Sequence, residues 1–251
     1  MNEIQLTGIC AEIARLMIIY GAEIYRVEDT IARICRAYKH EEAEIYATPA
    51  NFIITVKDKN NVPYTDSKSI SGRETNLDRV GKINELSRFI CSEKPGADVI
   101  LRKLEQIKER KTYSPTVIYI SYFISGAAFT LFFNGTPIEA LFGGLLGLVI
   151  NFITVRLQRV KASAFLNAVA CSMAISLLAV IINYIGFVPR FDKMIIGASM
   201  ALVPGVALTN CMRDFISGDF ISGIYTLTEA LLIAVGMAVG AGSAVAAVIK
   251  F

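Results

Sequence analysis

The chain of 251 residues is 54% hydrophobic and has a formal net charge of +3 at pH 7. Its 25 basic and 22 acidic residues are unevenly distributed, because only 12 of them follow Lys111. A small net charge of mixed sign in the charged half argues against a nucleic-acid partner. The asymmetry predicts a small cytosolic α+β domain at residues 1–111, followed by a membrane α-helical bundle at residues 112–251.

The five cysteines are widely spaced and form no Cys-x-x-Cys pair, so the usual zinc and redox motifs are absent from the sequence and we expect no metal and no cofactor. The N-terminus carries Glu3, Glu12 and Arg15 and lacks the basic region and apolar core of a secretory signal peptide. We therefore predict that the first domain remains in the cytosol.

Between Leu6 and Tyr38 apolar residues recur at spacings of three and four, which predicts one amphipathic helix or two helices joined near Gly21. Such a helix can lie on a membrane surface or pack on the sheet of its own domain. We favour packing on the sheet, because the acidic residues of the helix oppose binding to anionic lipid.

The pattern then changes to short runs rich in β-branched and aromatic residues, which predicts strands at 43–48, 51–57 and 62–68. The last two strands are expected to form a hairpin. Helical spacing returns at 78–90 and again from residue 97 to about residue 110, so the first domain is predicted to be a small α+β fold.

Five apolar segments follow, and each is long enough to cross about 30 Å of hydrocarbon, which takes about 20 helical residues. The predicted spans are about 117–133, 137–155, 162–185, 194–212 and 220–249. Small-residue spacings at Gly143-x-x-x-Gly147 and Gly236-x-x-x-Gly240 predict close helix approach.

Orientation follows from the basic residues between the spans. With the first domain inside, nine cations flank the membrane on the inner side, and Arg190, Lys193 and Lys250 lie on the outer side. This bias obeys the positive-inside rule. Five spans then place the N-terminal domain in the cytoplasm and the C-terminus outside.

The stretch from Ser199 to Leu232 combines high hydrophobicity with ionisable side chains, which cost about 2.5–3.5 kcal/mol each at a bilayer centre and therefore face protein, water or an interface. These side chains are Arg213, Asp214, Asp219 and Glu229. Residues that interrupt or loosen helices accompany them, namely Pro204, Gly205, Gly218 and Gly223. Discontinuous helices of this kind build solute sites in secondary transporters, so we predict a site between broken fourth and fifth spans.

Within this stretch Thr209 and Arg213, and likewise Asn210 and Asp214, are four residues apart and share a helix face if the helix is continuous. We expect these four residues and Asp219 to bind solute, with a guanidinium fork for a carboxylate, and Asp214 to bind an amine or relay a proton. The alternative is an interfacial role, in which Asp214 and Asp219 cap the fifth span.

Two further carboxylates lie in apolar segments. Glu229 is ten residues, or about 15 Å of helix, beyond Asp219, which is too deep for an interface, so we expect it to relay protons. Glu139 opens the second span, and we interpret it as a helix-start charge rather than as a relay.

Three stretches, taken in order, carry a distinctive pattern. The run LVPGVALTNCMRDFISGDFISGIYTLTEALLIAVGMAVG (Leu202–Gly240) holds a Pro-Gly, an Asn, an Arg-Asp pair and a Gly-Asp. The run MIIYGAEIYRVEDTIARICRAY (Met17–Tyr38) has a Gly followed by an Arg-Val-Glu triplet, and Asn76–Ile90 follows the strands. Together they resemble the bacterial threonine/serine exporter family over most of the chain.

The resemblance implies a proton-coupled exporter, in the bacterial inner membrane, of small carboxylate-bearing solutes: threonine and serine, or a dicarboxylate such as succinate. The chain resembles the larger subunit of the split form of the family, whose other half is a second short membrane protein. A partner subunit of that kind, a homo-oligomer, or both are therefore expected. An odd number of spans fits two halves that pair in inverted topology.

Two other functions stay open. One is a membrane-tethered hydrolase, but the sequence has a single histidine, His40, and no nucleophile-elbow, P-loop or dinucleotide motif. We interpret His40 as a solvated residue at a helix end. The other is a membrane sensor that binds a solute in its first domain without transporting it.

Overall fold

The computed structural model describes residues 1–40, 42–72, 74–110 and 113–249. Lys111, where we place the domain boundary, and Lys250, one of the expected outer cations, lie outside these ranges. The chain forms two compact units, Met1–Thr112 with Thr209–Thr226, and Tyr113–Leu208 with Leu227–Phe251. The first unit therefore includes a segment near residue 209 that the sequence assigned to the membrane part.

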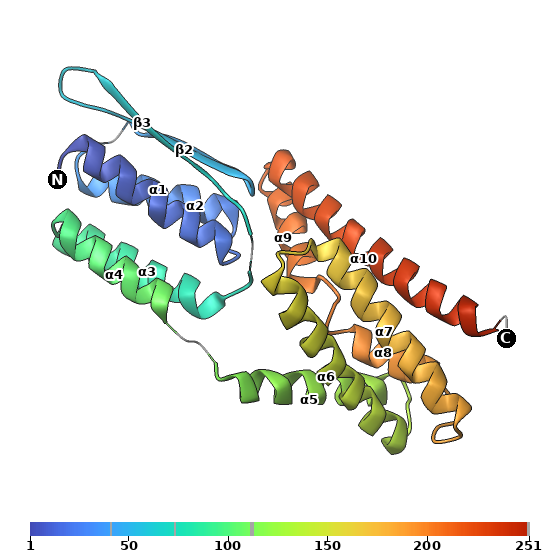
Figure 1. The fold of residues 1–251 in the computed structure, drawn as a ribbon. Coiled ribbons are helices and arrows are strands. Elements are labelled where there is room, and N and C mark those ends of the chain that lie inside the picture. The colour runs from blue at the N-terminus through green and yellow to red at the C-terminus, as the bar shows by residue number, and fades with distance from the viewer. Residues whose placement is uncertain (41, 73, 111–112, 250–251) are drawn as a thin grey trace. The chain divides into compact units, whose positions relative to one another are not determined.

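The N-terminal part of the first unit is the predicted α+β fold. Its elements in order are α1 (Glu3–Ile19), α2 (Ile24–Ala37), β1 (Glu44–Ala47), β2 (Asn51–Lys57), β3 (Pro63–Ser69), α3 (Leu77–Glu93) and α4 (Ala97–Glu109). The strands form an antiparallel sheet in the order β1-β2-β3, and β2 and β3 are the expected hairpin. The sheet lies on one side of α1 and α2, and α3 and α4 lie on the other (Figure 1).

The predicted amphipathic stretch forms two helices, with the turn at Gly21. This glycine has φ +87°, a conformation that costs residues with a Cβ but not glycine. The last carbonyl groups of α1 are not left unpaired, because Ile19 O accepts from Glu74 N–H at 2.8 Å and Tyr20 O accepts from Asn76 N–H at 3.0 Å. These two hydrogen bonds connect the turn to the segment that leads into α3.

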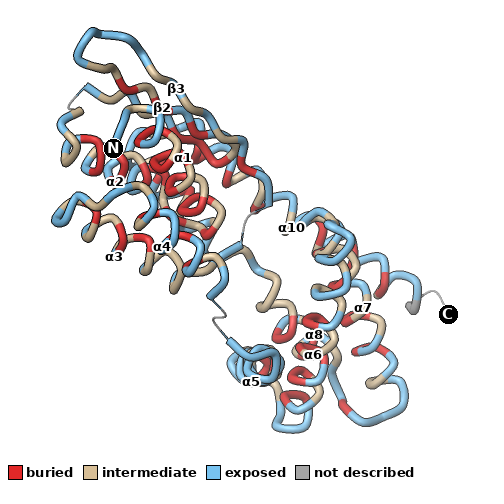
Figure 2. The backbone as a smooth tube through the Cα atoms, turned by 60° about the vertical axis from the view of Figure 1, so that its left-hand side comes forward, coloured by how far each residue is buried: buried red, intermediate tan, exposed pale blue. Residues whose placement is uncertain are grey.

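Helix α1 is the centre of the domain core. Its side chains from Leu6 to Ile18 are buried almost all round, as the red segments of Figure 2 show. Strand β2 alternates buried Phe52, Ile54 and Val56 with more exposed residues, so one face of the sheet packs on the helices. The apolar stripe of α1 is therefore used inside the domain, and the membrane-surface alternative is wrong for it.

A charge cluster joins α1 to α4. The Glu12 carboxylate accepts from Arg15 Nε and Nη2, each at 2.8 Å, and lies 3.0 Å from Lys108 Nζ. The hydrogen bond from Arg15 is the main cause that lowers the pKa of Glu12 from 4.5 to about 2, with burial opposing it and Lys108 adding to it. A lowered pKa stabilises the fold above pH 4.5, and this stabilisation is lost as the pH falls towards 2.

We expect Glu12→Gln to destabilise the first unit at pH 7 by on the order of 1 kcal/mol, because solvent screens part of the ion-pair energy. Thermal unfolding of the full chain in detergent measures the effect. Glu105→Gln, which removes the exposed second partner of Lys108, is the control and should change little. The loss of stability caused by Glu12→Gln should become smaller between pH 4.5 and pH 2. A loss that stayed constant over this range would contradict the stabilising role of ionised Glu12.

The second unit contains three long apolar helices, the short helix α8 and most of α10. Their bounds are α5 (Pro115–Phe132), α6 (Pro137–Arg159), α7 (Ala164–Tyr184), α8 (Asp192–Ser199) and α10 (Phe220–Ile249). Among the described residues, α5, α6, α7 and α10 are the four helices long and apolar enough to cross a membrane. Four of the five predicted spans thus have a matching helix.

The predicted fourth span, 194–212, is broken, as Pro204 and Gly205 led us to expect. Helix α8 ends at Ser199, and α9 (Gly205–Ile216) begins after an irregular segment that includes Pro204. Proline has no N–H, and its ring collides with the carbonyl group four residues earlier, so a helix cannot pass through Pro204 undistorted. Leu202 N–H instead bonds to Ser199 O at 2.8 Å in a tight turn.

Glycines let the long helices of the second unit approach closely, as their spacing predicted. A Cβ at Gly126 of α5 would collide with the carbonyl of Gly143 on α6, and one at Gly147 would collide with that of Tyr122. A Cβ at Gly240 of α10 would likewise strike the main chain of α7 at Val169. These backbones touch because no side chain separates them.

Candidate functional site

The link between α9 and α10 is a helix end of defined geometry. Asp219 N–H donates to Asp214 O at 2.9 Å and Gly218 N–H donates to Phe215 O at 3.1 Å, the two bonds of a Schellman motif. Gly218, with φ +85°, occupies the left-handed position that such a motif needs. The backbone at Gly218 therefore ends α9 and redirects the chain.

Asp219 begins the next helix. Its Oδ1 accepts from Ser222 N–H at 3.1 Å, which is an N-cap hydrogen bond to the third residue of α10. The capping role that we considered for Asp219 is therefore present. Gly223 lies inside α10, where its N–H bonds to Asp219 O at 3.0 Å, so the helix is not interrupted there as we had expected. A Cβ at Gly223 would collide with the ring of Phe215, which packs on it.

Helix α9 holds the four predicted solute ligands in one continuous element. Because α9 is helical from Gly205 to Ile216, Thr209 and Arg213 share one face, and Asn210 and Asp214 share another. Thr209 and Arg213 are exposed, Asn210 is half-buried, and Asp214 is 4% exposed. A carboxylate removed from solvent to this degree is costly unless it is well partnered.

Arg213 forms an ion pair with Glu23 through Nη1 and Oε1. Glu23 is the N-cap residue of α2, its side chain is 11% exposed, and its other oxygen lies 2.7 Å from Arg26 Nε. One carboxylate therefore holds two arginines, one on α2 and one on α9. No local pattern in the sequence identified Glu23 as the partner of Arg213.

A second carboxylate of α2 faces the same link. Glu28 accepts a hydrogen bond from Ala47 N–H at 3.0 Å and is half-buried. Burial raises the pKa of Glu28, the hydrogen bond from Ala47 opposes the rise, and the negative charge of Asp219 adds to it. Glu23 and Glu28 thus bring an acidic edge of α2 to Arg213 and Asp219. In the sequence the signal was the Arg-Val-Glu triplet that ends at Glu28.

Two further carboxylates, those of Glu229 and Glu139, belong to the second unit. Glu229 is half-buried and lies nine residues beyond the first residue of α10, about 14 Å along the helix. Glu139 is fully buried and forms a capping box with Thr136, whose N–H donates to Glu139 Oε2 at 2.7 Å. Glu139 Oε1 lies 3.7 Å from Arg190 Nε. The interpretation of Glu139 as a helix-start charge agrees with this capping box.

The ion pair between Arg213 and Glu23 is a contact in which one carboxylate can replace another. A guanidinium held by one carboxylate can release it in favour of another carboxylate, since both offer the same oxygen acceptors. Over the described ranges, no three His, Cys, Asp or Glu side chains come together as a metal site would require. His40 Nδ1 lies 3.3 Å from the carbonyl oxygen of Lys57, on the β2 strand.

Comparison with known proteins extends over nearly the whole chain. Residues 8–248 match the family model described as "Putative threonine/serine exporter". A Mycobacterium tuberculosis protein named "Probable threonine/serine exporter" is 22% identical over 232 residues, which cover 91% of this chain and 43% of that protein. An uncharacterized protein of Schizosaccharomyces pombe is also 22% identical, over 92% of this chain and 32% of its own length.

The chain thus spans less than half the length of these curated relatives. No solved structure matches. The family match includes α2 with its acidic edge, the interrupted helices α8 and α9, and α10 with Glu229. With its apolar helices and a match over most of its length, this chain is a multi-pass membrane protein and belongs to the threonine/serine exporter family.

Proposed function

We propose that this protein exports small carboxylate-bearing solutes across the membrane, driven by protons, and is a transporter rather than an enzyme. The observation that carries the proposal is the family match over residues 8–248. The matched region contains the interrupted helices α8 and α9, and α9 holds Arg213 and Asp214. The substrate class is threonine and serine or a dicarboxylate such as succinate, because a guanidinium fork suits the carboxylate that they share.

In the proposed cycle, Arg213 exchanges the Glu23 carboxylate for the carboxylate of the solute. Thr209 lies one turn before Arg213 on the same face, where its hydroxyl can bond the solute. Asn210 and Asp214 bind the amine or the second carboxylate of the solute. Asp214 also takes up and releases a proton. Asp219 keeps its N-cap bond while contributing negative charge, and Glu229 relays protons along α10.

The membrane part is proposed to have five crossings, the fourth made by α8 and α9 together. Neither helix is long enough alone, since 8 and 12 residues span about 12 and 18 Å. Transporters use such half-helices where a cavity satisfies the freed backbone groups, and Pro204 and Gly205 lie at this break. The first domain is then cytoplasmic, the C-terminus is outside, and the membrane is the inner membrane of a bacterial cell.

This orientation predicts opposite accessibility at the two ends of α6, whose 23 residues span about 34 Å. Asn134 and Gln158 are both exposed side chains near these ends. In a Cys91→Ser background, a cysteine at Asn134 should react with an impermeant maleimide in intact cells. A cysteine at Gln158 should react only after permeabilisation, because Arg156 and Arg159 hold that end inside. Equal labelling in intact cells would overturn the orientation.

A second membrane subunit, a homo-oligomer, or both are proposed to complete the transport unit. Support comes from the relatives, in which the matched region is 43% and 32% of the whole protein. Inverted pairing of two halves would place the site at their junction. Mild-detergent purification of the tagged chain from its native cells tests this. Recovery of the monomer alone, with full export activity after reconstitution, would contradict it.

Export from loaded vesicles tests the function. Vesicles carrying this chain and any co-purifying subunit are loaded with labelled threonine, serine or succinate, and efflux is measured with and without an imposed pH gradient. We expect efflux of at least one of these solutes to follow the pH gradient, with vesicles loaded with a neutral sugar, which has no carboxylate, as the control. Efflux equal to that of protein-free vesicles for all three solutes would overturn the proposal.

A further inference from the structure

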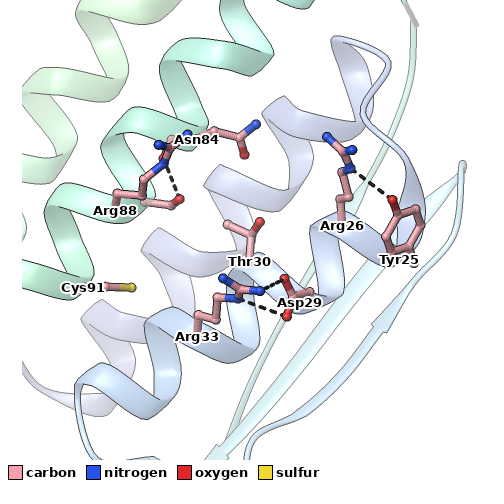
Figure 3. A pocket seen from close by; sticks show the side chains of 9 residues that line it. Tyr25, Arg26, Asp29, Thr30, Arg33, Asn84, Arg88 and Cys91 are labelled. Carbon is pink, nitrogen blue, oxygen red and sulfur yellow. Dashed lines mark hydrogen bonds and ion pairs between the residues drawn. The ribbon is translucent and has the colours of Figure 1, made fainter.

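A cavity of about 380 Å³ lies between α2 and α3 in the first unit, away from the acidic edge of α2. Figure 3 shows the side chains of the two helices that line it, with the guanidinium group of Arg33 turned to Asp29 on its own helix. They include Arg26, Thr30 and Arg33 of α2 and Asn84, Arg88 and Cys91 of α3. The volume falls within the usual range for small-molecule sites, about 300–1,000 Å³.

The lining carries more positive than negative charge. It includes three guanidinium groups, those of Arg26, Arg33 and Arg88, and one carboxylate, that of Asp29. Arg33 Nη2 lies 2.8 Å from Asp29 Oδ2, so this pair neutralises one charge, and Arg26 is shared with Glu23 outside the cavity. Placing several arginines close together costs free energy because their charges repel. The exposed ion pair between Arg33 and Asp29 recovers little of this cost.

The neutral donors complete a site for anions. The Thr30 hydroxyl and the Asn84 amide line the same cavity and can donate hydrogen bonds to oxygen atoms of a ligand. Arginine forks favour carboxylate and phosphate groups, whose oxygens match the spacing of the guanidinium N–H groups. Two separated arginines, Arg33 and Arg88, on facing helices suit a ligand with two negative charges.

We propose that this cavity binds a small dianion, either a dicarboxylate or a phosphate, held between Arg33 of α2 and Arg88 of α3. The dianion bridges the two helices and draws Arg26 toward the cavity. Since Arg26 and Arg213 share Glu23, the bound dianion competes with Glu23 for one of its two partners. Arg26 and Glu23 thus connect this site to the proposed transport site, but binding of the dianion does not require the chain to transport a solute.

Cys91 provides a local reporter. All five cysteines lie in the described ranges; four are buried and Cys91 is half-buried. Burial raises the pKa of the Cys91 thiol, and the nearby Arg33 opposes this rise. A bound anion both covers the thiol and offsets the charge of Arg33, so it lowers the thiolate fraction that reacts.

The experiment measures the rate of Cys91 modification by N-ethylmaleimide in the detergent-solubilised full chain. Succinate, inorganic phosphate and chloride are compared at equal ionic strength, and Cys91→Ser defines the background. We expect one or both dianions to slow modification about tenfold at saturation, which corresponds to about 1.4 kcal/mol. Protection by succinate alone assigns a dicarboxylate, and protection by phosphate alone assigns a phosphate ligand.

Variants then locate the site. Arg88→Gln should lose protection, while Arg36→Gln, which removes an exposed arginine of α2 outside the cavity, should keep it. Each rate is compared with and without the dianion in the same variant, so a change in basal reactivity does not matter. Equal protection by chloride, protection that survives Arg88→Gln, or no protection by either dianion in the native chain would overturn the proposal.

Discussion

Glu229→Gln is expected to abolish the response of export to a pH gradient while leaving insertion and solute binding intact. Glutamine keeps the size of the side chain and most of its hydrogen bonding, but it cannot take up and release a proton. Glu229 lies about 14 Å along α10, and the proposed crossing would place it at a depth where a carboxylate is costly. We expect pH-driven efflux from loaded vesicles to fall by at least about tenfold.

Glu139→Gln is the matched control, because it removes the other carboxylate of the apolar helices. Its glutamine oxygen can still accept from Thr136 N–H in the capping box, so α6 should keep its start. Export by this control should retain its dependence on the pH gradient. If Glu229→Gln exports as well as the native chain under a pH gradient, Glu229 does not relay protons. Its role would then be polar packing between helices.

Arg213→Lys is expected to weaken solute binding by about tenfold or more, seen as a raised apparent KM for export. The ammonium keeps the charge but cannot reproduce the planar fork that holds a carboxylate through two hydrogen bonds. Glu23→Gln should act in the opposite direction, because Arg213 then no longer has to release a carboxylate before it binds the solute. Both variants are measured in the same vesicle assay over a range of solute concentrations.

The double variant separates this exchange from a merely structural ion pair. If Glu23 acts only through Arg213, Glu23→Gln gives no gain in the Arg213→Lys background, and the two effects are not additive. Arg26→Lys, which alters the other partner of Glu23, serves as a control and should leave KM near that of the native chain. A KM unchanged in Arg213→Lys would exclude Arg213 as the solute ligand.

Local patterns accounted for most of the elements. Period-two alternation located β2, and spacings of three and four located α3 and α4 to within a few residues. The glycine spacings on α6 and α10 predicted contacts that the glycines make. Hydropathy does not reveal that 194–212 is two helices, because both halves are apolar, but Pro204 and Gly205 predicted the break.

The residues of the candidate site were also only partly predictable from the sequence. Sequence alone identified Arg213, Asp214, Asp219 and Glu229, because charges in apolar segments are conspicuous. It did not identify Glu23 as the partner of Arg213, or Glu28 as the neighbour of Asp219. A glutamate on an amphipathic helix has the same local pattern whether it faces solvent or a distant arginine.

By itself, the sequence determined the division into a charged α+β part and an apolar helical part, the start and end of most elements, and the family. Each of these follows from the order of residues along the chain and does not require knowing which distant residues meet. Tertiary structure alone decided that α2 brings Glu23 to Arg213, and that α2 and α3 place Arg33 and Arg88 around one cavity. Such contacts depend on how helices pack across long chain separations, and the burial that drives this packing is not directional.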